Sequence, residues 1–157
     1  MVSPYGCIDL KHDDTIKYYG SEEDTVGIWK VRGIRGATTA SDNTKEAIAQ
    51  AVTELLDAIE SRNQFDPEDI VSVTFTATGD LDAIFPAAIA RQRPQWDTVP
   101  LLDVQQMQVE GSLKRCIRVL IHLNTPLPQK EIYHSYLRDA CHLRPDWSLT
   151  HASSSVS

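Results

Sequence analysis

The second half of the chain contains the run Arg115-Cys116-Ile117-Arg118-Val119-Leu120-Ile121-His122-Leu123. Its β-branched and aliphatic residues predict a buried β-strand. Arg118 interrupts this apolar run, and a guanidinium that is buried without an anion is strongly destabilising. Either the chain supplies a carboxylate to Arg118, or the protein binds an anionic ligand there.

The size and charge of the chain limit what it can bind. Its 157 residues suffice for one domain with a hydrophobic core. The formal net charge of −7 argues against a nucleic-acid partner, because phosphates bind to basic surfaces. A small anion in a local basic pocket is still compatible with this charge.

Neither a membrane segment nor a metal site is expected. No run of about 18 apolar residues is present, and the N-terminus lacks the basic and apolar regions of a secretory signal. The three cysteines, Cys7, Cys116 and Cys141, do not have the spacing of metal ligands. We therefore expect a cytoplasmic protein with free thiols.

Hydrophobic periodicity predicts four strands and three helices. Apolar residues alternate along 28–35, and we expect a turn at 36–39. Asn43 and Glu46 form a capping-box pattern that begins an amphipathic helix ending near residue 61. The other expected elements are strands at 70–77, 99–103 and 115–123 and helices at 86–93 and 129–140. This order predicts one α+β (mixed α/β) domain with a core small enough to favour an oligomer that buries one sheet face.

The two ends of the chain differ from the middle. Residues 1–27 contain six acidic residues and two lysines but few apolar ones, so we expect a disordered extension. The folded domain is expected at 28–150, and the serine-rich residues 151–157 are expected to form a flexible tail.

The chemistry-bearing residues do not form a nucleophile–base motif, a phosphate loop or a dinucleotide fingerprint. Instead, arginines recur beside apolar strands and helices, at Arg35, Arg91 and Arg118. Fixed guanidinium groups suit a site that holds a polyanionic small molecule without attacking it.

Four separated motifs carry a resemblance to a known family. They are Val31-Arg32-Gly33-Ile34-Arg35-Gly36-Ala37-Thr38-Thr39, Ala83-Ile84-Phe85-Pro86-Ala87, Gly111-Ser112-Leu113-Lys114-Arg115-Cys116-Ile117-Arg118-Val119 and Leu143-Arg144-Pro145-Asp146. In order and spacing, from about residue 29 to 150, the chain resembles the monofunctional chorismate mutases of the AroH class.

This resemblance implies a homotrimer with a pseudo-α/β-barrel core of the chorismate mutase II type and active sites between subunits. The implied reaction is the Claisen rearrangement of chorismate to prephenate, in phenylalanine and tyrosine biosynthesis. That rearrangement is unimolecular and needs no cofactor. An enzyme accelerates it by holding the compact conformer of a dicarboxylate and by stabilising negative charge on the breaking ether oxygen.

The resemblance also implies roles for individual residues. Arg118 would face the ether oxygen and a carboxylate, while Arg35 would hold the other side of the substrate. Tyr136 would donate a hydrogen bond to a carboxylate. Phe85 and Arg91 would enter the site from the adjacent subunit.

The resemblance also implies a C-terminal lid, and the chain departs from the family pattern at two positions. Leu143 would line the lid. Gln106 stands where the family has a glutamate, three residues after a cysteine that is replaced here by Asp103. Ala88 replaces an accessory lysine. We hypothesise that Asp103 supplies the missing carboxylate; the alternative is a solvated Asp103 and a weak or inactive enzyme.

Two competing functions remain open. The Gln106 and Ala88 departures are compatible with a non-catalytic trimer that binds chorismate, prephenate or an aromatic amino acid. Fold analogy alone suggests a trimeric deaminase-like protein that uses arginines between subunits. An assay of chorismate loss separates the enzyme from the binder.

Overall fold

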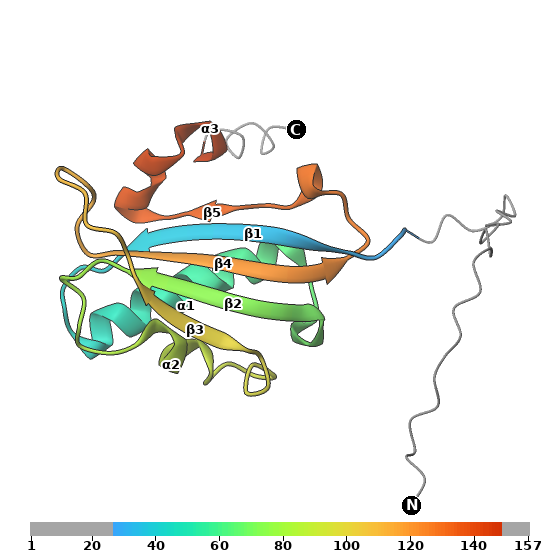
Figure 1. Ribbon diagram of the computed structural model, residues 1–157, viewed down its shortest axis with the longest axis horizontal. Coiled ribbons are helices and arrows are strands. Elements are labelled where there is room, and N and C mark those ends of the chain that lie inside the picture. Colours follow the sequence, from blue (N-terminus) through green and yellow to red (C-terminus); the bar gives the residue numbers. More distant parts are fainter. Residues whose placement is uncertain (1–26, 149–157) are drawn as a thin grey trace, which may run out of the picture.

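The computed structural model describes residues 27–148 as one five-stranded mixed sheet with two helices on one face (Figure 1). The strand order is β3-β2-β4-β1-β5. The elements are β1 Lys30–Thr39, α1 Lys45–Asn63, β2 Ile70–Ala77, α2 Pro86–Ala90, β3 Leu101–Gln105, β4 Cys116–Thr125, β5 Ser135–Tyr136 and α3 Pro145–Ser148. The α+β class is confirmed. The extension and the tail lie almost wholly outside the described residues.

Strand β4 is the centre of the sheet. It pairs antiparallel with β1 on one side and with β2 on the other, while β3 and β5 add parallel strands at the edges. Alternate residues of β4, namely Ile117, Val119, Ile121 and Leu123, are buried in the core that α1 covers. The predicted buried strand is confirmed, and Arg118 lies on its other face.

Helix α1 buries the apolar stripe expected from its sequence, and Ile48, Leu55 and Ile59 are fully buried. Its N-cap is Thr44, whose hydroxyl accepts a hydrogen bond from the Ala47 N–H at 3.1 Å. The prediction of Asn43 as the cap was therefore wrong by one residue. The Asn43 side chain instead bonds to the loop at Asp82, with its Nδ2 2.7 Å from Oδ1 of that residue.

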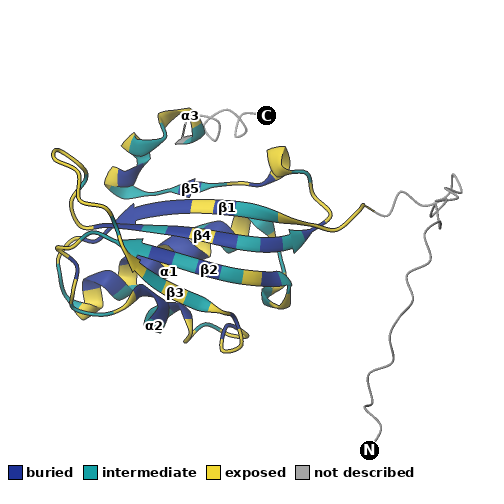
Figure 2. Ribbon diagram, viewed as in Figure 1, coloured by how far each residue is buried: buried dark blue, intermediate teal, exposed yellow. Residues whose placement is uncertain are grey.

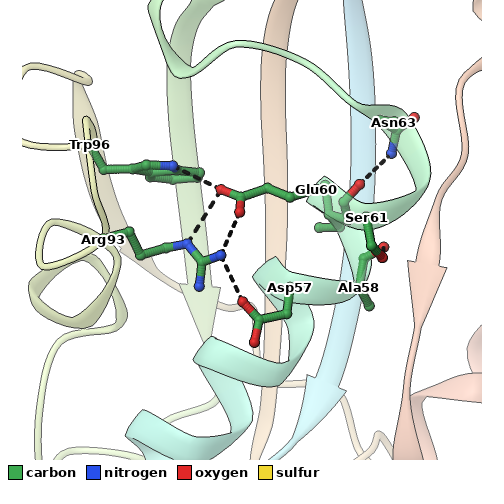
Figure 3. A network of polar contacts seen from close by, with 8 residues as sticks. Asp57, Ala58, Glu60, Ser61, Asn63, Arg93 and Trp96 are labelled. Atoms are coloured by element: carbon green, nitrogen blue, oxygen red, sulfur yellow. Dashed lines mark hydrogen bonds and ion pairs between the residues drawn. The ribbon is translucent and has the colours of Figure 1, made fainter.

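A polar network ties the segment after α2 to α1 (Figure 3). The Arg93 guanidinium forms ion pairs with Asp57 and Glu60, and the indole N–H of buried Trp96 donates to Glu60 at 2.9 Å. Although burial disfavours the charged form, these carboxylates raise the pKa of Arg93 above its usual range. Helix α2 itself ends at Ala90, earlier than the expected residue 93.

Four further expectations are corrected. Residues 36–39 continue β1 instead of forming a turn, because they pair with 116–119 of β4. The third strand lies at Leu101–Gln105 and not at 99–103, and β4 extends beyond residue 123. The helix expected at 129–140 is absent from the described structure: short 3-10 turns flank β5, which pairs with Gly36 and Ala37. Tertiary pairing here overrides local helical preference.

The second face of the sheet is not covered by helices in the single chain (Figure 2). Apolar side chains are exposed on and beside this face, including Leu102 at 59 % and Val104 at 44 % exposure. Between residues 27 and 148, none of the helices has the length and apolar content that crossing a membrane would require.

Candidate active site

A cavity of about 530 Å³ lies on the uncovered face of the sheet. The structure brings five of the eight predicted site residues together around it, namely Arg35, Gln106, Arg118, Tyr136 and Leu143. These residues come from β1, β4, β5, the end of β3 and the C-terminal segment, so the cavity depends on the sheet topology and not on one local motif.

The sheet register explains why three of these side chains meet. Arg118 of β4 pairs with Ala37 of β1, and Ala37 also pairs with Tyr136 of β5. Directly paired residues project to the same face of a sheet, as do residues two apart in one strand. Arg35 is two residues before Ala37, so the two arginines and the tyrosine share the uncovered face.

Polar atoms in this cavity lack partners within the described part of the chain. Arg118 Nε, Gln106 Oε1 and Thr76 Oγ1 are buried and have no hydrogen-bond partner among residues 27–148. Each unsatisfied buried polar group costs about 1–3 kcal/mol. Arg118 also forms no ion pair with an acidic side chain in this range. These atoms are therefore arranged for a bound molecule that carries both hydrogen-bonding groups and negative charge.

The thiol of Cys116 is an alternative partner for Arg118. Burial raises the pKa of this thiol, although a hydrogen bond from Arg118 and its charge act in the opposite direction. The neutral thiol therefore does not supply the anion that Arg118 needs.

Arg35 stands at the exposed rim of the cavity. Its backbone N–H donates to Nδ1 of His134 at 2.9 Å, and its guanidinium carbon lies 5.7 Å from the ring centroid of Trp147. Burial, together with the charges of Arg35 and Arg144, lowers the pKa of His134. The ring is therefore held neutral beside two cations.

Sequence reasoning missed several residues that line this cavity or lie beside it. Thr76 could have been found, since strand alternation places it on the face opposite Phe75. His134 was hidden because it fell within the helix that was wrongly expected there. Arg144 belongs to a quoted motif but received no role, and Trp147 had no recognisable signal.

The other three predicted residues form a second cluster, separate from the cavity. Phe85, with 70 % of its surface exposed, and Asp103 line a neighbouring cavity of about 580 Å³, and the charge of Arg91 acts on Asp103. Asp103 pairs with the core residue Phe75, so it faces the helices, whereas Arg118 pairs with Thr76 and faces away. Within one chain, the structure does not bring Asp103 to Arg118.

The carboxylate of Asp103 contacts the beginning of α2. Its Oδ1 accepts a hydrogen bond from the Ala87 N–H at 3.0 Å. Burial raises the pKa of Asp103, although this bond and the Arg91 charge lower it. Asp103 is therefore a partly desolvated acid beside exposed Phe85, not a solvated strand-end residue.

Metal ligands are not gathered in the part of the chain that the structure describes: no group of three or more His, Cys, Asp or Glu side chains there could hold an ion. The polar side chains that line the first cavity carry guanidinium groups, amides, a phenol and hydroxyls. Such a set binds and orients a polyanion.

Comparison with known proteins identifies the family. The model for chorismate mutase type I matches residues 31–147. The chain is 47 % identical to chorismate mutase AroH of Bacillus subtilis over 120 residues, covering 76 % of this chain and 94 % of that protein. It is 49 % identical to chorismate mutase AroH of Thermus thermophilus over 117 residues, covering 74 % and 95 % of the two chains.

A solved structure agrees with these relatives. The chorismate mutase from Clostridium thermocellum superimposes with a TM-score of 0.66 at 44 % identity, covering 69 % of this chain and 96 % of that one. The matching family is chorismate mutase type I, so the expectation of a core of the chorismate mutase II type is corrected. The chain therefore belongs to the chorismate mutase type I family, in the AroH class that its sequence motifs resemble.

Proposed function

We propose that this protein rearranges chorismate to prephenate in the cytoplasm, in sites shared between the subunits of a homotrimer, as a step toward phenylalanine and tyrosine. Family membership supports the reaction. The observation that carries the assignment of the site is the cavity in which Arg118 Nε, Gln106 Oε1 and Thr76 Oγ1 lack partners among the described residues.

The arginines suit the electrostatics of this reaction. Chorismate carries two carboxylates, and its ether oxygen gains negative charge as the C–O bond breaks. Arg118, in the central strand, stabilises this oxygen and one carboxylate, while Arg35 and Tyr136 hold the substrate from the cavity rim. A preorganised donor of this kind lowers the barrier by roughly 3 kcal/mol, by analogy with an oxyanion-hole donor.

Gln106 has a binding role that differs from that of a glutamate. Its buried Oε1 can accept a hydrogen bond from the substrate hydroxyl. As a neutral amide, it cannot offset the positive charge that develops on the ring in the transition state. We therefore propose that Gln106, without a carboxylate from elsewhere, supports slower turnover than a glutamate at the same position would.

The trimer explains the second cluster and the uncovered sheet face. Exposed Phe85 and the apolar side chains of Leu102 and Val104 are suited to contact with a neighbouring subunit. In such an assembly Phe85, Arg91 and Asp103 of one subunit border the arginine cavity of the next. Asp103 then supplies from a neighbour the carboxylate that Gln106 lacks.

Following the loss of chorismate absorbance with purified protein tests this proposal, with sedimentation velocity reporting the assembly. Acceleration over the uncatalysed reaction by a trimer is the expected result. A folded trimer that binds chorismate without accelerating its loss would support the binding protein suggested by Gln106. A monomer with full activity would refute the shared sites.

A further inference from the structure

The C-terminal segment packs against the cavity through one aromatic ring. The Trp147 indole stacks on His134 with ring centroids 4.1 Å apart and planes 24° from parallel. The guanidinium carbon of Arg144 lies 3.3 Å from the Trp147 ring centroid, and Tyr136 meets the same indole edge-on at 5.7 Å. Trp147 thus contacts residues from β5 and from the segment that lines the cavity.

Each partner of Trp147 is linked to the cavity. His134 accepts the hydrogen bond from the backbone N–H of Arg35, and Tyr136 and Arg144 line the cavity directly. Asp146 fixes Arg144 through two hydrogen bonds, from Nε at 3.0 Å and from Nη2 at 2.7 Å. The stack therefore connects three polar side chains at one rim of the site.

We propose that Trp147 and His134 are positioning residues, which hold Arg35, Tyr136 and Arg144 in the geometry that receives a carboxylate of the substrate. This inference rests on the proposed function. Stacking and cation–π contacts restrict the rotamers of long side chains before the ligand arrives, and such preorganisation improves affinity because less freedom is lost on binding.

The proposed positioning role requires a neutral His134. Nδ1 accepts a hydrogen bond from Arg35, so this nitrogen must be unprotonated. Protonation would replace the accepted bond with a repulsive contact and add a third positive charge. The charged groups around the ring are Arg35 on β1, Arg144 and Asp146 in the C-terminal segment, and Lys130 and Glu131, which line the adjoining cavity with His134.

The pH dependence follows from these contacts. Because the pKa of folded His134 is lowered, the unfolded chain takes up this proton first as the pH falls. The neutral ring contributes fully to the stability of the fold above the ordinary histidine pKa of about 6.5. This contribution is lost as the pH falls through the lower pKa of the folded state. The KM of the wild-type enzyme should therefore rise over that acidic range.

Trp147→Leu and Trp147→Phe test the positioning role, with Trp29→Leu as the matched control at an exposed tryptophan outside the cavity. We expect Trp147→Leu to raise KM roughly tenfold, which is about 1.4 kcal/mol, with kcat changed less than threefold. Trp147→Phe should recover most of the loss. An unchanged KM in Trp147→Leu, or equal losses in both Trp147 variants, would overturn the proposal.

Two further measurements separate this inference from the proposed function. Nuclear magnetic resonance titration of labelled histidines should show the pKa of His134 moving toward its ordinary value in Trp147→Leu, and an unmoved titration would refute the stack. If the wild type does not convert chorismate, calorimetry with chorismate replaces kinetics: a tenfold weaker Kd in Trp147→Leu supports positioning, and an unchanged Kd refutes it. His134→Asn should retain an acceptor and flatten the acidic rise in KM or Kd.

Discussion

Arg118 and Thr76 are cross-strand neighbours in β4 and β2, and each carries a buried side-chain atom without a hydrogen-bond partner among the described residues. Placing two unsatisfied groups together in the middle of a sheet lowers stability, and natural proteins retain such costs mainly at functional sites. Substrate atoms are the partners that the proposed reaction would supply.

Arg118→Ala should abolish measurable turnover without dissociating the assembly. Loss of a donor that acts in the transition state corresponds to a fall in kcat on the order of a hundredfold or more. Steady-state kinetics and sedimentation should be compared with Arg62→Ala, which removes an exposed cation from the last turn of α1. A rate within tenfold of the wild type would refute the assigned role.

Gln106→Glu should raise kcat in an Asp103→Asn background, in which the neighbouring subunit no longer supplies a carboxylate. The new carboxylate would lie in the cavity with Arg118 and would offset the positive charge that develops on the ring. We expect a gain of roughly tenfold, which corresponds to a barrier lower by about 1.4 kcal/mol. The gain in kcat should disappear as the pH falls through the glutamate pKa. Gln106→Met is the control, because its side chain has no amide to accept a hydrogen bond and carries no charge. A slower Gln106→Glu enzyme would contradict the proposed role of this position.

Asp103→Asn tests whether this carboxylate acts across the subunit boundary. The proposal expects kcat to fall at neutral pH, and an unchanged rate would rule out the relocation of the charge. The amide oxygen of the substituted side chain could still accept the hydrogen bond from Ala87, so a loss confined to Asp103→Ala would assign the residue to support of α2 instead.

Although Asp103→Asn should lower kcat, it should raise the free energy of unfolding at neutral pH. Because burial raises the folded pKa of Asp103, the protonated acid favours folding, and its contribution is lost as the pH rises through the folded value. The asparagine variant lacks this penalty, so it should be more stable than the wild type at pH 7, with the difference shrinking in acid. Urea unfolding at several pH values measures this, and a variant that is less stable at pH 7 would contradict it.

Glu60→Ala should destabilise the fold by roughly 2 kcal/mol, because it removes the shared acceptor of Arg93 and Trp96. Only 15 % of the Arg93 side chain is exposed, so water cannot fully replace the lost carboxylate. The matched control is Glu54→Ala, which breaks the more exposed ion pair with Arg138 and should cost less than about 1 kcal/mol. Equal midpoints of urea unfolding for the two variants would show that the network in Figure 3 contributes little.

Local patterns predicted the elements whose periodicity agrees with their packing. Strand β2 has the predicted bounds, and α1 buries the predicted stripe. The helix expected at 129–140 was wrong, because no local signal reveals that Ser135 and Tyr136 pair with Gly36 and Ala37 about a hundred residues earlier. Long-range pairing of this kind decides the state of a short segment.

The candidate site was predictable only in part for the same reason. The pattern of arginines indicated an anion-binding site, and the family resemblance supplied the roles of Arg118 and Arg35. The face occupied by Asp103 depends on its register with Phe75, which spacing along the chain cannot reveal. His134 and Trp147 meet only once the C-terminal segment folds over β5.

The position of β4 has a consequence for the timing of catalysis. Strands β1 and β2 bond to β4 from both sides, so the amide of Arg118 should be among the last to exchange with deuterated solvent. The group that we propose meets the breaking bond thus lies on the part of the domain that should open most slowly. The guanidinium of Arg118 is therefore positioned when the domain folds, before any ligand binds. In the proposed reaction this charge would not have to move.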